Sequence, residues 1–157
     1  MFATELVTML EAGAGLVVGT VSPDGTPRAD RAWAASVVDA ETRRIRFVMS
    51  ADDPEVAANL ESGAVSLTGA DVRTYQSVQL KGRPVVVETP TPADVELARL
   101  QSETFFEAVH ITDGNPVEAL RRMLPREMVV VEMVVEETFD QTPGPSAGSV
   151  LTESDDG

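Results

Sequence analysis

Alternating apolar and polar positions predict that much of the chain forms β-strands. Residues 44–50 place Ile45, Phe47 and Met49 on one side and arginine side chains on the other. This period of two is typical of a half-buried antiparallel strand. Further runs of β-branched and apolar residues predict strands at 16–21, 28–38, 64–68, 76–88 and 127–139.

Two of these strands carry additional information. The strand over 76–88 contains Gly82-Arg83-Pro84, and glycine and proline inside a strand predict a bend. The strand over 127–139 is nearly continuous valine and methionine. We therefore expect it to be covered on both faces, by the core or by a partner subunit.

Helical spacing is confined to four segments. Residues 2–12 repeat apolar side chains every three or four positions, and Gly13-Ala14-Gly15 then ends the helix. Each of the other three begins with a capping residue and a proline at the first helical position. These pairs are Asp53-Pro54, Thr91-Pro92 and Asn115-Pro116. They predict helices over 54–61 and 92–109 and a third that ends before Pro125, the second burying Val95, Ala98, Phe105 and Val109.

The order of these elements indicates the fold class. A helix, three strands, a short helix, two strands, two helices and a strand follow one another. Successive strands joined by turns favour a mainly β protein, an antiparallel barrel with peripheral helices. Residues 1–140 form a single domain in this interpretation. Residues 141–157 are rich in proline, glycine, serine and acidic residues, and we expect a mobile tail there, above all in its last ten or so residues.

Composition excludes several function classes. The chain has 157 residues, the size of one ordinary domain, and 12 basic residues against 26 acidic ones give a net charge of −14. So acidic a surface repels phosphate backbones and anionic lipids, so we expect neither nucleic acid nor a membrane as partner. There is no basic leader and no apolar run of about 20 residues, so a cytoplasmic location is expected.

The reactive side chains are few. The chain contains no cysteine, which excludes disulfides, thiolate catalysis and zinc–thiolate sites. Its one histidine, His110, excludes metal sites that need several imidazoles from one chain, and its place near a helix end suits a cation. Helix capping and solvation are the favoured interpretation, over a hard-cation site, for the carboxylates of Asp52, Asp53 and Glu55. We therefore assign no metal site and no catalytic residue.

Three short segments carry a resemblance. Gly25-Thr26-Pro27-Arg28 opens the strand with Trp33, Asn59-Leu60-Glu61-Ser62-Gly63 follows the strand ending Phe47-Val48-Met49-Ser50, and the third is Gln76-Ser77-Val78-Gln79-Leu80-Lys81-Gly82. Together with the strand order, they make residues 5–90 resemble the pyridoxamine 5'-phosphate oxidase-like family of FMN-binding split barrels. Gln141-Thr142-Pro143-Gly144-Pro145 is similar to an ending found in an uncharacterised bacterial branch of it.

The resemblance implies a six-stranded antiparallel split barrel that forms a homodimer, with FMN in a groove between the subunits. In the family, an Arg-x-x-x-x-Lys strand and an Arg-Lys pair entering the short helix hold the phosphate. A polar residue on the third segment of the other subunit contacts the ring. The implied function is a flavin-binding, small-molecule oxidoreductase with hydride chemistry on the flavin.

The sequence departs from this pattern at the phosphate. In one register Asp30 takes the place of the arginine; a shift by one restores Arg31, but neither register supplies the lysine. Pro54-Glu55 replaces the basic pair, directly after Asp52 and Asp53. A carboxylate ~4 Å from a phosphate costs on the order of 4 kcal/mol at an effective dielectric of ~20. The second hypothesis is therefore a non-catalytic split barrel that has lost the standard FMN site and binds another small ligand, deazaflavin or haem.

Seven residues on or next to the matching segments are candidates for binding the cofactor. They are Arg28, Arg31, Trp33, Ser50, Ser77, Gln79 and Lys81. Arg28 and Arg31 are an odd number of positions apart, so at most one of them lines the groove. The resemblance makes Ser77 the ring contact. Alternatives remain open, namely surface arginines, a core tryptophan, serines in turns or caps, and a solvated face for Gln79 and Lys81.

Overall fold

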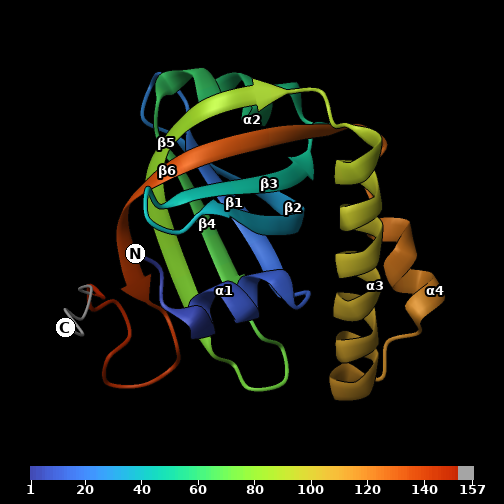
Figure 1. Ribbon diagram of the computed structural model, residues 1–157. Helices are drawn as coiled ribbons and strands as arrows, with labels where there is room; N and C mark the ends of the chain where they lie inside the picture. The colour runs from blue at the N-terminus through green and yellow to red at the C-terminus, as the bar shows by residue number, and fades with distance from the viewer. Residues whose placement is uncertain (152–157) are drawn as a thin grey trace.

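Six antiparallel strands close into a barrel in the computed structural model of the protein, which describes residues 1–151 (Figure 1). Around the barrel the order is β1-β2-β3-β6-β5-β4, and β4 pairs with β1 to complete the ring. This confirms the expected fold class. The strands are β1 (Gly15–Val21), β2 (Pro27–Asp39), β3 (Arg44–Ser50), β4 (Val65–Ala70), β5 (Ser77–Glu88) and β6 (Met128–Asp140).

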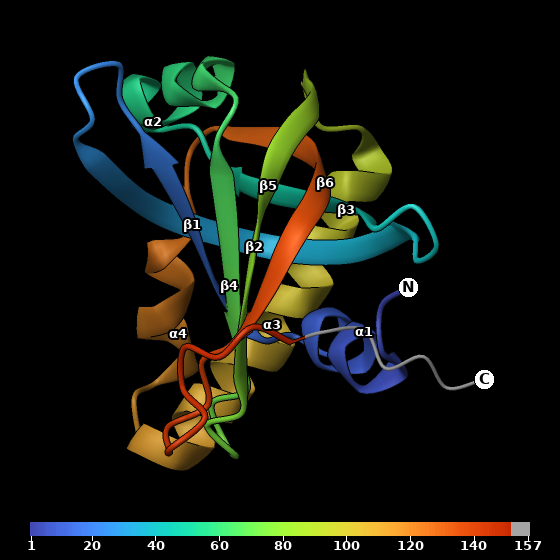
Figure 2. The same cartoon turned by 90° about the vertical axis from the view of Figure 1, so that its left-hand side faces the viewer.

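The helices lie outside the barrel, and their order along the chain is the expected one. Figures 1 and 2 show α1 and α2 at opposite ends of the barrel, and Figure 1 shows α3 standing beside it with α4 next to α3. Within residues 1–151 no helix is long and apolar enough to cross a membrane. The helices are α1 (Thr4–Glu11), α2 (Pro54–Asn59), α3 (Pro92–Asp113) and α4 (Val117–Leu120), with 3₁₀ turns η1 (Leu60–Ser62) and η2 (Arg121–Met123).

Two of the three expected helix caps are confirmed. The Asp53 side chain accepts a hydrogen bond from the Glu55 backbone N–H, and Thr91 forms a reciprocal capping box with Asp94. The cap expected at Asn115 is wrong. Pro116 is extended and is itself the N-cap, so α4 begins one residue later and no side chain caps it.

The long helix α3 differs in detail from its prediction. It continues to Asp113 and ends at Gly114, whose φ of 75° is a left-handed conformation that glycine adopts readily. Ala98 is buried and Phe105 and Val109 pack partly against the barrel, but Val95 is 49% exposed. The expectation that Val95 lies on the buried side is therefore wrong; Asp94 beside it faces the barrel instead.

The interior of the barrel is the main core. Alternate side chains of all six strands point inward, and Leu10 of α1 packs against the same cluster. The bend predicted in β5 is confirmed, since its register against β6 shifts after Lys81 and again after Pro84. A Cβ at Gly82 would lie 1.9 Å from the Val134 carbonyl oxygen, so only glycine allows this close approach. The buried members include Leu16, Val18, Ile45, Phe47, Leu67, Leu80, Val131 and Met133.

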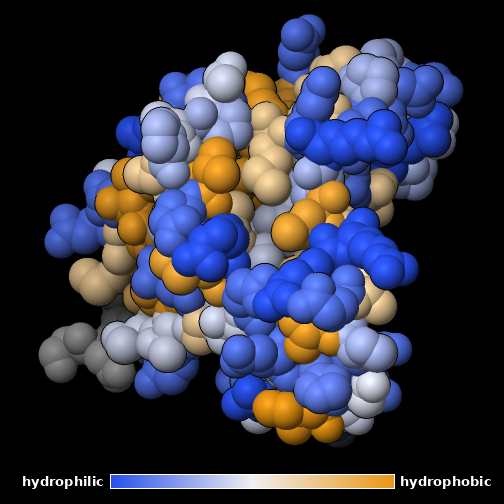
Figure 3. Space-filling model, turned by 90° about the vertical axis from the view of Figure 1, so that its right-hand side faces the viewer, coloured by the Kyte–Doolittle hydropathy of each residue, from blue (hydrophilic) through white to orange (hydrophobic). Residues whose placement is uncertain are grey.

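A second core lies between α3 and the outer wall formed by β2, β3 and β6. Its buried members are Trp33, Ala34, Val48, Ala98, Phe106, Leu120 and Val130. Val130 faces this layer and Val131 the barrel interior, which confirms that β6 is covered on both faces. The opposite side of α3 faces solvent, and Figure 3 shows that face as mostly hydrophilic with separate apolar patches.

One ion pair connects α3 to the barrel wall. Two guanidinium nitrogens of Arg46 on β3 donate to the two Asp94 carboxylate oxygens, each at 2.8 Å. Asp94 also accepts from the Thr91 N–H and hydroxyl, while Arg46 also contacts Glu88 and Glu132. The Arg46 hydrogen bond, followed by those of Thr91, holds the pKa of Asp94 well below its ordinary value of 3.8.

The segment after β6 folds back along the barrel. The backbone N–H of Gln141 donates to the Ser77 carbonyl, and that of Leu151 donates to the Thr138 carbonyl. Val150 forms a β-bridge with Phe139. The expected mobility of the last residues falls largely on 152–157, outside the described part of the chain, and remains a prediction.

Replacing Asp94 tests the attachment of α3 to the barrel wall through Arg46. Asp94→Asn should lower the free energy of unfolding by about 2–3 kcal/mol at neutral pH, because Arg46 loses a mostly buried ionic partner but keeps two others. The Asp94 pKa is lower in the folded than in the unfolded state, so its contribution is complete above the unfolded value. It should decrease progressively as the pH falls below 3.8 toward the lower pKa of the folded state.

Denaturant unfolding of both proteins from pH 7 to pH 2 measures the difference. Glu96→Gln is the control, because Glu96 pairs with Arg99 on the exposed side of the same helix and its loss should change little. A constant difference between the parent protein and Asp94→Asn at every pH would contradict the assignment.

Candidate functional site

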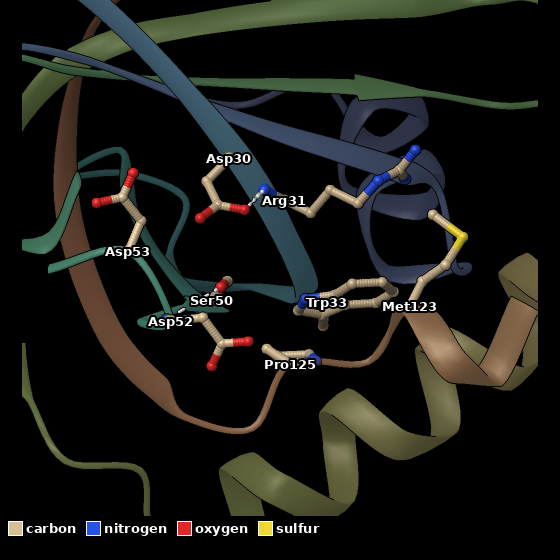
Figure 4. A pocket seen from close by; sticks show the side chains of 8 residues that line it. All are labelled: Asp30, Arg31, Trp33, Ser50, Asp52, Asp53, Met123 and Pro125. Carbon is tan, nitrogen blue, oxygen red and sulfur yellow. Dashed lines mark hydrogen bonds between the residues drawn. The ribbon is translucent and has the colours of Figure 1, made fainter. Parts of the chain in front are cut away.

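A cavity of about 380 Å³ opens on the outer wall of the barrel, within the size range of small-molecule sites. Strand β2 and the end of β3 supply one side, and η2 with the segment before β6 closes the other side (Figure 4). The acidic rim consists of Asp30 on β2 and of Asp52 and Asp53 in the β3–α2 connection. The lining residues are Asp30, Arg31, Trp33, Ser50, Asp52, Asp53, Met123 and Pro125.

Trp33 combines a core position with a place in the cavity wall. It is only 5% exposed, and its ring meets Phe106 edge to face, with centroids 6.0 Å apart. Its indole Nε1 is buried and has no hydrogen-bond partner among residues 1–151. Figure 4 shows the nitrogen edge of the indole turned toward Ser50 and Asp52. An unsatisfied buried donor costs about 1–3 kcal/mol, so a ligand that accepts this hydrogen bond would recover it.

Arg31 is the basic residue of the lining. Its guanidinium lies 5.8 Å from the centre of the Phe105 ring, close enough for a cation–π contact. Within residues 1–151 it forms no ion pair. Figure 4 shows its side chain extending away from Asp30, so the positive charge sits toward Met123 and away from the three aspartates.

Three aspartates form the acidic rim, and each accepts backbone hydrogen bonds. Asp30 accepts from the Arg31 N–H at 2.7 Å, and Asp53 caps α2 through the Glu55 N–H at 2.9 Å. Asp52 accepts from the N–H groups of Arg126 at 3.0 Å and Glu127 at 2.8 Å. None of the three forms an ion pair with the described residues. The lining therefore has three carboxylates and one guanidinium, a formal excess of two negative charges.

Ser50, the last residue of β3, lines the cavity near Asp52. It is 6% exposed, and its hydroxyl oxygen accepts from the Asp52 N–H at 3.3 Å. Its own hydroxyl proton has no acceptor among the described residues, so Ser50 can donate into the cavity.

The structure thus brings together three of the seven candidates, Arg31, Trp33 and Ser50. Arg28 lies outside the lining, and its guanidinium donates to Glu55 at 2.7 Å on the exposed surface. A phosphate near α2 would therefore meet a neutralised arginine and the Asp53 cap. Among the described residues that line the cavity, Arg31 is the basic one.

The remaining candidates lie along β5, away from this cavity. Ser77 uses its backbone groups to hold Thr142, and Gln79 donates to the Thr68 hydroxyl at 3.2 Å. The Lys81 ammonium lies 4.4 Å from the centre of the Phe139 ring. Their role in a groove shared between subunits remains a prediction.

The lining also contains residues that the sequence did not indicate. Met123 and Pro125 enter through η2 and the segment before β6, and Asp52 fixes that segment from 74 residues away. No local pattern marks such a long-range contact. Within residues 1–151 no group of metal-ligating side chains is close enough to hold an ion.

Comparison with known proteins agrees with the fold. HupZ of Group A Streptococcus is 17% identical, with 94% of this chain and 100% of that chain covered and a TM-score of 0.56. A putative pyridoxamine 5'-phosphate oxidase of Lactobacillus delbrueckii is 19% identical, with 88% and 93% covered and a TM-score of 0.55. An F420 reductase is 16% identical, with 83% and 93% covered and a TM-score of 0.53. At these identities the likeness concerns the fold alone.

The sequence comparison is more specific. Among curated proteins none matches the chain. The sequence profile of the pyridoxamine 5'-phosphate oxidase family matches residues 2–140, which include all six strands and the whole cavity lining. The chain therefore belongs to the pyridoxamine 5'-phosphate oxidase family.

Proposed function

We propose that the protein binds a flavin-type ring in the cavity beside Trp33 and holds it without the family's phosphate grip. The observation that carries this proposal is the buried, unpartnered Trp33 Nε1 at the wall of a cavity of about 380 Å³. A flavin ring carries carbonyl oxygens and ring nitrogens that can accept such a bond. Membership of the family favours this class of ligand.

The charges of the lining argue against a bound phosphate. FMN brings about −1.5 to −2 charges, and the rim already holds three carboxylates without ionic partners among the described residues. Arg31 can offset one such charge but not three. We therefore place the flavin ring in the cavity. The phosphate of a phosphorylated flavin would lie outside the acidic rim.

Oxidoreductase activity on a small molecule is part of the proposal only as far as a flavin is bound, because the flavin supplies the hydride chemistry. The second candidate is non-catalytic binding of another ligand, such as deazaflavin or haem. The lining favours this alternative in one respect. It contains no histidine, lysine, tyrosine or cysteine, and each carboxylate already accepts backbone hydrogen bonds.

A homodimer also belongs to the proposal. In the family arrangement a second copy would bring its own β5 to the groove, with Ser77 as the ring contact. Gln79 and Lys81 share the face of β5 with Ser77, and all three are at least partly exposed in the single chain. A second copy would complete the cavity on its open side.

Fluorescence of the single tryptophan tests the proposed ligand, because Trp33 lines the cavity. Riboflavin, which has no phosphate, should quench Trp33 emission saturably and bind at least as tightly as FMN. Added salt should reduce the difference in affinity between riboflavin and FMN, because it screens the charges of the acidic rim. The Trp33→Phe variant, followed through flavin emission, should bind riboflavin several-fold more weakly, because the flavin ring loses the Nε1 donor. No saturable binding of either flavin, or FMN binding about 100-fold tighter than riboflavin, would contradict the proposal.

Two arginine variants test which cation faces the ligand. Arg31→Gln should raise the riboflavin dissociation constant about tenfold, since hydrogen bonds to charged groups contribute about 1.5–3 kcal/mol. Arg28→Gln should change it less than about twofold, because Arg28 is paired with Glu55 outside the lining. The same titration measures both. Equal effects of the two substitutions would place the ligand elsewhere.

A further inference from the structure

Trp33 lies in a β-bulge of β2. The register against β3 steps over Trp33, whereas Ala32 and Ala34 on either side of it each have an opposite residue. Ala32 and Ala35 both belong to the barrel interior, and Trp33 and Ala34 between them both belong to the outer core beneath α3. Strict alternation running back from Ala35 would put Trp33 in the barrel interior. The indole therefore reaches the outer wall because the bulge is held.

Side chains take the place of a neighbouring strand along this part of β2. Within residues 1–151 the pairing of β1 with β2 ends at Ala32. Farther along the same edge, the Gln101 amide accepts from the Ala35 N–H at 3.0 Å and donates to the Ala35 carbonyl at 2.9 Å. The Glu11 carboxylate then accepts from the Val37 N–H at 2.9 Å. The two bonds at Ala35 reproduce the N–H and carbonyl contacts of a residue in an antiparallel ladder.

The contact made by Gln101 is buried and joins α3 to the bulge. Gln101 is 7% exposed, and Ser102 beside it is 2% exposed. The Ser102 hydroxyl lies 3.5 Å from the Trp33 carbonyl oxygen, so α3 contacts β2 on both sides of Ala34. A side-chain amide presents an acceptor and a donor side by side, as a backbone does. An apolar side chain in the place of Gln101 would leave a buried N–H and a buried carbonyl without partners.

We propose that Gln101 is a positioning residue, which fixes β2 at Ala35 and thereby holds Trp33 in the bulge with its indole at the cavity wall. Gln101 does not line the cavity of about 380 Å³, so it acts on a ligand only through Trp33. This inference rests on the proposed function in one respect, that the ligand contacts Trp33. The alternative is a stabilising contact alone, in which Gln101 satisfies two backbone groups without deciding where the indole lies.

Gln101→Met separates these two roles, because it keeps the length of the side chain and removes both hydrogen bonds. In the ligand-free protein the single indole signal of the ¹H–¹⁵N spectrum should move, since Trp33 is the one tryptophan of the chain. The riboflavin dissociation constant should rise about 3- to 10-fold, because the Nε1 donor no longer points at the ligand. A contact that only stabilises the fold would lower the free energy of unfolding and change neither the indole signal nor the affinity.

Gln101→Glu provides a rescue in the same side chain. A protonated carboxyl group accepts through one oxygen and donates through the other, as the amide does, whereas a carboxylate cannot donate to the Ala35 carbonyl. The indole signal should therefore be displaced at pH 8 and return toward its parental position near pH 4, where Asp94 stays ionised. Burial and Glu11, two positions along the β2 edge, raise the pKa of the new carboxyl group, and Arg31, which borders a small gap with Gln101, lowers it. The parent protein and Gln101→Met should show no such return.

Glu11→Met is the matched control. Glu11 contacts the same edge of β2 two residues beyond Ala35, and it lies outside the cavity lining. Its replacement also deprives a backbone N–H of a side-chain acceptor. The indole signal should stay in place, and the riboflavin dissociation constant should change less than about twofold. A displacement of the indole signal equal to that in Gln101→Met would show that any loss along this edge moves Trp33, and would overturn the inference.

The outcomes separate this inference from the proposed function. An indole signal that stays in place in folded Gln101→Met would overturn the inference and leave the flavin proposal intact. A displaced indole signal with unchanged riboflavin affinity would overturn the role of Gln101 in binding. A displaced signal that recovers at low pH in Gln101→Glu supports the positioning of Trp33 even if riboflavin does not bind the parent protein, a result that overturns the flavin proposal alone. If Gln101→Met does not fold, the pH series of Gln101→Glu gives the same decision.

Discussion

The ion pair between Arg46 and Asp94 anchors the start of α3, the helix that covers Trp33, to the outer wall of the barrel. It joins α3 to the outer wall of the barrel through two hydrogen bonds of 2.8 Å, and the same carboxylate closes the capping box that starts the helix. With α3 fixed there, Trp33 is buried between the strand and the helix. The chain then returns through α4 and η2, which bring Met123 and Pro125 to the cavity wall. The ion pair thus contributes to the stability of the fold and to the position of α3 beside the proposed ligand site.

Residues of the acidic rim likewise combine a structural role with a place in the cavity lining. Asp52 anchors the segment before β6, Asp53 starts α2, and both remain in the cavity lining with their charges. Glu55, in the first turn of α2, pairs with Arg28 on the exposed surface, so the charge of Arg28 does not offset the acidic rim. The barrel has the fold of its family, and the lining of its cavity carries more acidic than basic side chains. This difference is why we separate binding of a flavin ring from binding of its phosphate.

Most of the fold could be predicted because its signals are local. The period of two in residues 44–50, the proline after Asp53 and Thr91, and the glycine bend in β5 each act within a few residues. The cap at Asn115 failed because the proline itself took the extended conformation of the N-cap.

The candidate site could be predicted less completely from the sequence, for a physical reason. Whether Arg28 or Arg31 faces the groove depends on Glu55, a partner 27 residues away from Arg28. The contribution of Met123 and Pro125 depends on a contact across 74 residues. A single sequence gives no pattern for such pairings, and the partner-subunit contacts expected for Ser77, Gln79 and Lys81 are of the same kind.

The indole N–H of Trp33 offers the most direct measurement. The chain has one tryptophan, so a ¹H–¹⁵N correlation spectrum contains a single indole signal, and that signal reports the donor at the cavity wall. On titration with riboflavin this account predicts that the signal moves downfield and saturates, because the proton gains an acceptor. An indole signal that stays in place while backbone signals elsewhere respond would show that the ligand site is not the cavity beside Trp33.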